Sequence, residues 1–367
     1  MRQKNIMTTG LVALALGTTG CIGGDSGSSG NGNGNGNGNG NGSGSSELEI
    51  VHARDVYDGD STELEETAPL ATDDDAALAM DFAYFAYLVE TAMDSFEVVT
   101  QQNREDDEAT QQTVESDCHL HPGEVELEEE VSPAQPSPGD TVTMTTTWTT
   151  HPDDGYCIEL LNHDAPVVFH GEVTQVSETE YHDDGSVGVT TSVTTYEDFS
   201  MEWLSLQVGE ELVEVILSGE DHRGSLGDSA GGDVENYIAI ALDVELPQLG
   251  DGDELHTILR NGHFGTDMEQ VIDMELASPF LEGTVTTNQV DPETFFDGGS
   301  DTPQTCDGGP LNNAEDSTNG SVEITADAVE YLGELQGISD CGEFVLSAVA
   351  GGGSGGTYML LDQLLEQ

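Results

Sequence analysis

Basic residues are almost absent from this sequence. The chain holds six lysines and arginines against 73 aspartates and glutamates. After Cys21 there is no lysine, and this region holds four arginines and all 73 acidic residues, so its formal net charge is 4 − 73 = −69. A protein that binds nucleic acid needs a basic surface to meet the phosphates. The scarcity of basic residues therefore excludes nucleic acid as a partner.

The acidic residues are spread along the whole region after Cys21. Such a charge opposes compaction by self-repulsion. At about 1 M salt the Debye length is only about 3 Å, so most of that repulsion is removed. In this pattern the chain resembles the acidic secreted proteins of extreme halophiles, in which surface Asp and Glu replace Lys. The resemblance implies a domain that folds in molar salt. The alternative is that the acids bind a cationic partner or calcium.

A long hydrophobic run is missing from the N-terminus. Arg2 and Lys4 precede a short apolar stretch, residues 11–16, which is typical of an export signal and too short to span a bilayer. The letters "TTGC", ending at Cys21, resemble the lipobox of prokaryotic lipoproteins. The resemblance implies a signal peptide over 1–20 and a lipid on Cys21 that anchors the protein to the membrane. The protein would then lie in the cell envelope, outside the cytoplasm, in the outer membrane or at the cell surface.

A low-complexity segment follows the proposed lipid site. Residues 22–46 are almost entirely Gly, Asn and Ser, including the run NGNGNGNGNGNG. With almost no apolar side chains to bury, this segment should be a disordered tether with a span of about 25–30 Å. The sequence pattern then divides the chain into 1–20, signal peptide; 21–46, lipidated Cys and linker; 47–116, acidic lead-in and helix; 117–290, β-meander; and 291–367, C-terminal loop, strands and short helix.

One segment has helical periodicity. Apolar residues from Leu78 to Phe96 recur at steps of three and four. Thr72, followed by three aspartates, offers an N-cap and negative charge at a helix start. The pattern predicts a helix over about 73–101. Because Asp81 and Glu90 interrupt its apolar surface, we expect a buried packing helix rather than a membrane span.

From about residue 124 to 290 the apolar period changes to two. The segments 141–149, 234–246 and 268–276 alternate apolar with polar residues, which predicts strands with one face on a core and the other in water. Turn-forming residues separate these strands. Asn261-Gly262, between two apolar stretches, predicts a hairpin.

The region after 290 begins with a Gly/Asp/Pro-rich loop. Two more strands are expected near 321–331 and 343–349, and a short helix within 358–365. No helical stretch of useful length separates the strands, which excludes a parallel βαβ architecture. The predicted fold is mainly β: an antiparallel meander, as an open sheet or a sandwich, with one N-terminal packing helix and a short C-terminal helix.

Four cysteines remain after Cys21. In an exported protein they indicate two disulfides, for which three connectivities are possible. We favour pairing between sequence neighbours, Cys118–Cys157 and Cys306–Cys341.

The stretch "DCHLHPG", residues 117–123, also raises the question of a metal site. On a strand, His119 and His121 would point to the same face, and His151 lies within the same proposed crosslink. With one carboxylate they would form a zinc or copper site. Pro122 favours a turn instead, which would leave two bystander histidines beside a disulfide.

A nucleophile motif also occurs by letter. Ser229 lies in "GDSAG", which matches G-x-S-x-G. A nucleophile elbow needs a buried strand before the serine and a helix after it. Here a polar loop precedes Ser229 and a strand follows, so we interpret the stretch as a glycine-rich turn.

These patterns favour a protein without catalytic activity and without a cofactor. We expect a lipid-anchored, surface-exposed envelope protein of a halophilic prokaryote with a β-rich binding or structural domain. Its ligand or protein partner is not specified by the sequence. The alternative is a metal-binding protein or metal-dependent enzyme that uses His119 and His121.

Overall fold

A computed structural model describes residues 48–366 of the chain, apart from a series of gaps. These gaps are 60–63, 65–66, 105–108, 117, 119–122, 135–136, 138, 153, 160–165, 183–185, 209–210, 227–234, 250–253, 266–270, 290–318, 337–342, 352 and 360. The described residues belong to one unit of the chain, Ser45–Gln367.

Strands dominate the described residues. The helices are α1 (Ala53–Val56), α2 (Asp73–Gln102) and α3 (Asp362–Leu365), with a 3₁₀ turn η1 (Pro279–Leu281). The strands are β1 (Gln111–Glu115), β2 (Glu124–Ser132), β3 (Thr141–Thr150), β4 (Tyr156–Glu159), β5 (Pro166–Tyr181), β6 (Val187–Val208), β7 (Glu211–Leu226), β8 (Glu235–Glu245), β9 (Leu255–Gly265), β10 (Val271–Ser278), β11 (Gly283–Gln289), β12 (Asn319–Ala326), β13 (Val329–Gln336), β14 (Glu343–Ala350) and β15 (Gly356–Met359).

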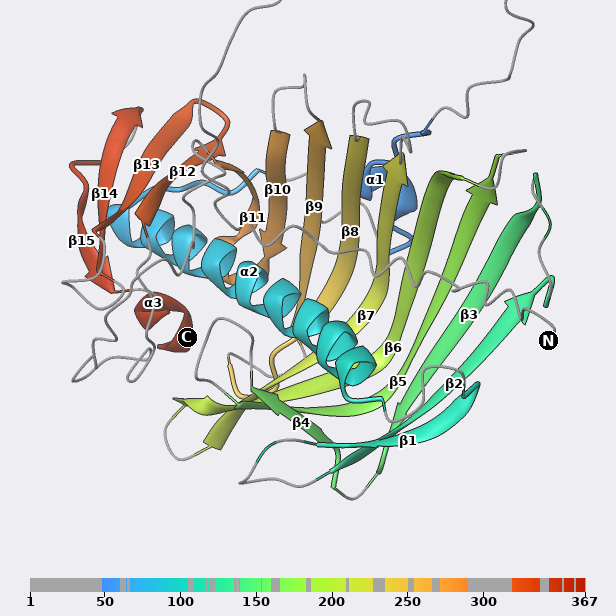
Figure 1. Ribbon diagram of the computed structural model, residues 1–367. Helices are drawn as coiled ribbons and strands as arrows, with labels where there is room; N and C mark the ends of the chain where they lie inside the picture. Colours follow the sequence, from blue (N-terminus) through green and yellow to red (C-terminus); the bar gives the residue numbers. More distant parts are fainter. Residues whose placement is uncertain are drawn as a thin grey trace, which may run out of the picture. The chain divides into compact units, whose positions relative to one another are not determined.

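These strands form one antiparallel sheet of fifteen strands. Their order in the sheet follows their order in the chain, except that β4 pairs with β5 off the main path. Figure 1 shows the sheet curving from β1 and β2 to β14 and β15. The predicted antiparallel meander is confirmed, and it takes the form of a single open sheet.

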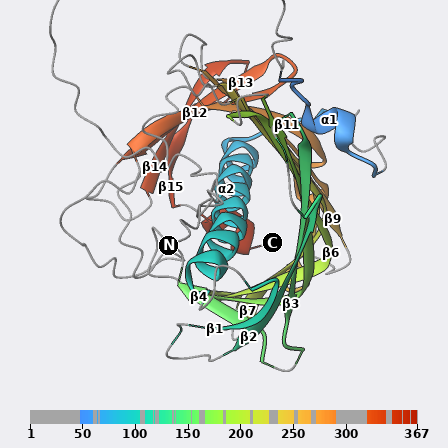
Figure 2. The same cartoon turned by 45° about the vertical axis from the view of Figure 1, so that its right-hand side comes forward.

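Helix α2 lies along the inner face of this curve (Figure 2). Thr72 accepts a hydrogen bond from the backbone N–H of Asp75, whose carboxylate accepts one from the N–H of Thr72, so the helix begins with a complete capping box. The helix predicted over 73–101 is confirmed. Most of its side chains are buried on all sides rather than along one stripe.

Phe96 shows how α2 packs against the sheet. Its ring contacts four aromatic rings on four strands, which are those of Trp148, Tyr156, Phe169 and Phe199, with centroids 4.9 to 6.3 Å away. Such large buried rings contribute most to a core per residue. The largest hydrophobic cluster therefore fills the space between α2 and the sheet.

The outer face of the central strands is also covered. Tyr237, Ala239 and Ala241 of β8 pack in a second cluster with Leu48 and Ala53 from the segment before α2. The expectation of a half-buried strand is therefore wrong for β8, which is buried from Ala239 to Leu242 without interruption. The acidic lead-in supplies the few apolar side chains that cover it.

Asn261-Gly262 does not form a hairpin. Both residues lie inside β9 and pair with β8 on one side and β10 on the other. The Asn261 side chain accepts the backbone N–H of Ala53 and donates to Asp273, each at 2.8 Å. Asn261 thus holds α1 against the sheet, and this tertiary contact replaces the turn that the dipeptide favours in isolation.

The strand expected near 321–331 is two strands. A tight turn at Asp327, which has a φ of 52°, separates β12 from β13. The strand expected at 343–349 is confirmed as β14, and the segment 358–365 contains the end of β15 and the expected short helix, α3.

Candidate functional site

The first proposed disulfide is present in the structure. Cys118 and Cys157 are bonded, with their Cα atoms 5.7 Å apart, and both are buried. The bond joins the segment after β1 to β4, which pairs with β5. Cys21, Cys306 and Cys341 lie outside the described residues, so lipidation and the second disulfide stay predictions.

The proposed metal ligands are described only in part. His151 follows β3, and its side chain is 47% exposed with Nδ1 3.6 Å from a carboxylate oxygen of Asp154. His119 and His121 lie outside the described residues, as does Ser229. In the part of the chain that the structure describes, no group of three or more His, Cys, Asp and Glu side chains is arranged to hold a metal ion. The metal site therefore stays a prediction.

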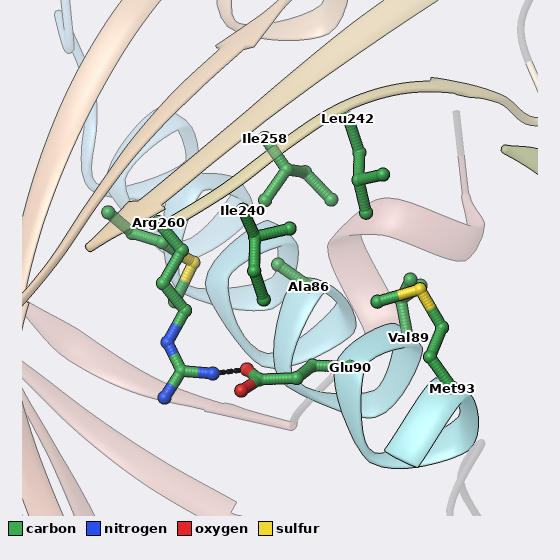
Figure 3. Close-up of a pocket in the computed structure, with 9 residues that line it drawn as sticks. Ala86, Val89, Glu90, Met93, Ile240, Leu242, Ile258 and Arg260 are labelled. Atoms are coloured by element: carbon green, nitrogen blue, oxygen red, sulfur yellow. Dashed lines mark ion pairs between the residues drawn. The ribbon is translucent and has the colours of Figure 1, made fainter. Parts of the chain in front are cut away.

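A small cavity lies between α2 and the central strands, and the sequence did not indicate it. It is lined by Ala86, Val89, Glu90 and Met93 of α2 and by Ile240, Leu242, Ile258, Arg260 and Met274 of β8, β9 and β10 (Figure 3). The volume open to the centre of a water-sized sphere is only about 10 Å³. That is about the space that a single water molecule needs. The cavity is therefore too small for an organic ligand.

One ion pair borders this apolar space. The Arg260 guanidinium of β9 pairs with the Glu90 carboxylate of α2, and their side chains are 14% and 10% exposed. Burial lowers the pKa of Arg260 to about 10, so the guanidinium remains charged at neutral pH. In Figure 3 the pair is drawn to the lower left of Ile240, Leu242 and Ile258. The pair ties the middle of α2 to the sheet.

A second charged cluster lies further along α2. Arg223 of β7 donates through Nε and Nη2 to Asp221 at 2.5 to 2.9 Å, and through Nη2 to Asp94 of α2 at 2.6 Å. Burial raises the pKa of Asp94 and of Glu97, while the nearby Arg223 acts in the opposite direction on both. One guanidinium thus faces three carboxyl groups beneath the sheet.

All four arginines after Cys21 connect a helical segment to the sheet. Arg54 of α1 pairs with Glu275 of β10, and Arg104, just after α2, pairs with Glu129 of β2. Arg223 and Arg260 bind α2 from the sheet side. Their scarcity is visible in the sequence, but their partners are not, because most lie far away along the chain.

The N-terminal half of α2 makes a different kind of contact. Asp73 accepts hydrogen bonds from the Tyr331 hydroxyl and from Ser354. Asp81 is fully buried, and its Oδ2 accepts the backbone N–H groups of Gln363 and Leu364 at 2.8 and 3.2 Å. Burial raises the pKa of Asp81 to about 8. In the sequence, Asp81 and Glu90 stand out only as interruptions of an apolar helix, although a buried acid in such a helix signals a specific partner.

Comparison of the chain with protein-family models, with curated protein sequences and with solved structures finds no match.

Helix α2 is long and apolar enough to cross a membrane, yet 89% of its most apolar window is buried within the fold. The described residues therefore define an antiparallel β-meander curved around one buried helix.

Proposed function

We propose that this protein is a lipid-anchored domain of the cell envelope of a salt-adapted prokaryote, and that it serves as a structural or binding module rather than an enzyme. In this proposal Cys21 is the anchor, on the basis of the resemblance to a lipobox, and residues 22–46 are the tether. The domain held by the tether is the β-meander with α2 in its concave face.

The filled concave face is the observation that carries the non-enzymatic part of this proposal. A curved sheet offers its inner face as the usual place for a ligand. Here α2 occupies that face with buried side chains along nearly its whole length. The cavity described above is small and bordered by a paired Glu and Arg. This arrangement supports recognition through outer surfaces or strand edges.

The distribution of charge supports the salt-adapted part. All four arginines after Cys21 are paired with carboxylates that fasten helical segments to the sheet, which leaves the acids elsewhere to be balanced by ions from the solvent. Screening by salt then decides whether the domain stays compact.

Replacing the proposed lipid attachment site tests the anchor. In the native host, Cys21→Ser should move the protein from the membrane fraction to the medium, because a flexible polar tail has no affinity for a bilayer. Ser26→Ala, in the same linker, should leave the protein in the membrane fraction. Both variants should melt like the wild type. A Cys21→Ser protein that stays membrane-bound would refute lipid anchoring.

Salt titration tests the proposed environment. Circular dichroism of a soluble form that begins at residue 45 should show β structure at about 2 M salt and substantial loss at about 20 mM, because the Debye length grows as salt is removed. Equal stability at both concentrations would contradict the salt-adapted reading and favour a specific cationic partner for the acids.

The metal-binding alternative has its own measurement. Elemental analysis of protein purified in high salt should detect no stoichiometric zinc or copper if the structural role is right. Bound metal that is lost in His121→Ala and kept in His182→Ala would favour the alternative.

A further inference from the structure

The segment from Gly353 to Leu365 is held against the beginning of α2 by carboxylates. The Tyr358 hydroxyl donates to Asp74 at 3.1 Å, Ser354 donates to Asp73 at 3.2 Å, and the first turn of α3 donates to Asp81. These bonds join parts of the chain that lie more than 280 residues apart. Each of these acids thus accepts hydrogen bonds from neutral donors, which are backbone N–H groups or hydroxyl groups.

Asp81 occupies the critical place in this contact. Leu361 stands at the N-cap of α3 and has no side-chain oxygen, so Asp81 supplies the cap from another helix. Leu361 and Leu364 are completely buried around it. Within the described residues, no hydrogen-bond partner is found for Oδ1 of Asp81. A buried carboxylate with one unsatisfied oxygen, and with no cation beside it among the described residues, is costly to ionise.

We propose that residues 353–366 form a latch, which Asp81 holds closed while its carboxyl group carries a proton, and which loosens as rising pH removes that proton. Opening brings the carboxyl group into water, where ionisation is no longer penalised, so opening and proton release to solvent are linked. This device lies beyond the proposed anchoring and structural role.

The direction of the pH effect follows from Asp81. Burial raises its pKa from 3.8 to about 8 in the closed state. The latch is therefore tightest below about pH 4. Between about pH 4 and 8, each unit of pH raises the ratio of open to closed latch by up to tenfold. Above about pH 8 this ratio no longer rises.

The groups around Asp81 leave the direction of its pKa shift unchanged. Asp362 of α3 is the charged group that acts on Asp81, and it raises the pKa of Asp81 further. Burial opposes the ionisation of Asp73, yet hydrogen bonds from Gly355, Tyr331 and Ser354 bring its pKa below the usual value. Burial and Asp74 raise the pKa of Tyr358 to about 12. Asp81 is therefore the group that couples the latch to pH.

Opening would uncover a strand edge. Residues 356–359 of β15 pair with 343–346 of β14, so release of the latch frees the backbone groups on this side of β14. A free edge accepts an added strand from a partner. The latch would thus control access to the edge of β14, because β15 is the last strand of the sheet while the latch is closed.

Amide hydrogen exchange of the domain in molar salt tests the proposal. The protection factors of Gln363 and Leu364 should fall between pH 5 and 8 by at least about tenfold relative to those of Ile240 in β8. Asp81→Asn keeps an acceptor oxygen and cannot ionise, so its latch should show no such fall. Asp74→Asn, in the same half of α2, should keep the wild-type slope.

Two results would overturn the latch. One is a wild-type protein in which the ratio of the protection factors of Gln363 and Leu364 to that of Ile240 does not change with pH. This measurement needs no variant, so it tests the latch even if Asp81→Asn fails to fold. The other is an Asp81→Asn protein that folds and keeps the wild-type pH slope, because the slope would then belong to another group.

Discussion

In its N-terminal half α2 offers carboxylates to neutral donors, whereas in its C-terminal half it offers them to arginines. Asp73 and Asp81 accept hydroxyl and backbone N–H groups of residues 331–364. Glu90 and Asp94 pair with guanidinium groups that project from the sheet. The same helix, with the same type of side chain, is thus docked in two ways.

The difference shows how a protein with few cations can use buried acids. An acid that faces a guanidinium keeps its charge, because the partner compensates for the lost hydration. Asp81, which is fully buried and faces only backbone donors, avoids the penalty by keeping its proton, as its raised pKa indicates. The contacts with arginine should therefore depend on the arginine, and the contact of Asp81 should depend on pH.

Removing Arg223, the arginine that faces three carboxyl groups, should have the largest effect on the free energy of unfolding. Arg223→Met leaves Asp221 buried beside Asp94 and Glu97 without a cation. Breaking a buried pair in this way costs about 3–5 kcal/mol of unfolding free energy. Chemical denaturation in molar salt measures the loss.

The matched control is Arg54→Met. The Arg54 side chain is 51% exposed in its pair with Glu275, so its loss should cost at most about 1 kcal/mol. Equal losses in the two variants would show that burial does not decide the strength of these pairs.

Acidification should weaken the N-terminal half of α2 through His256. Its ring contacts Phe82 of α2 and Phe280, and its Nδ1 lies 2.9 Å from the hydroxyl of Ser278. Burial lowers its pKa from 6.5 to about 4, so the unfolded chain takes up the proton first. Stability from this group is complete above pH 6.5 and is lost between about pH 6.5 and 4, by about 3 kcal/mol.

The variant His256→Gln isolates this effect. Unfolding free energies of the wild type and the variant, measured at pH 7 and pH 4.5, should differ in their pH dependence by most of that amount. Asp81 acts in the opposite direction over the same range and is common to both proteins, so it cancels in the comparison. Parallel pH profiles would rule out His256 as the group responsible.

The capping box at the start of α2 should have the smallest effect. Thr72→Ala removes the side-chain acceptor for the N–H of Asp75 and should cost about 1 kcal/mol. Thr72→Ser keeps the acceptor and should remain close to the wild type in thermal unfolding. A loss well above that of Arg54→Met without rescue by Ser would mean that Thr72 acts through packing.

Local sequence patterns predicted which helices and strands form better than they predicted which residues those elements contact. The capping residues and apolar spacing located α2, and alternation located most of the sheet, because both signals lie within a few neighbouring residues. The hairpin predicted at Asn261-Gly262 is wrong because pairing with two strands and the hydrogen bond from Ala53 override the turn preference of this dipeptide. The second core over β8 was missed because the segment that contains Leu48 and Ala53 mixes apolar with polar residues and has no clear helix or strand period.

The candidate site was harder to predict for a related reason. The rarity of arginine after Cys21 is plain in the sequence, yet the pairing of Arg260 with Glu90 or of Arg223 with Asp94 depends on how the sheet curves around α2. The cavity that Glu90 and Arg260 line is likewise formed by α2 together with three strands that lie far from it in the chain. Such contacts are set by topology rather than by a motif.

Two double-mutant cycles test most directly the claim that the few arginines stabilise the fold where water is excluded. Arg104–Glu129 and Arg54–Glu275 are both two-pronged Arg–Glu pairs, but the Arg104 side chain is 2% exposed and that of Arg54 is 51% exposed. Replacement of each residue by Met and Gln, singly and together, gives the coupling energy of each pair in molar salt. We expect about 1.5 kcal/mol or more for Arg104–Glu129 and below about 0.5 kcal/mol for Arg54–Glu275. Equal coupling energies for the two pairs would contradict the account.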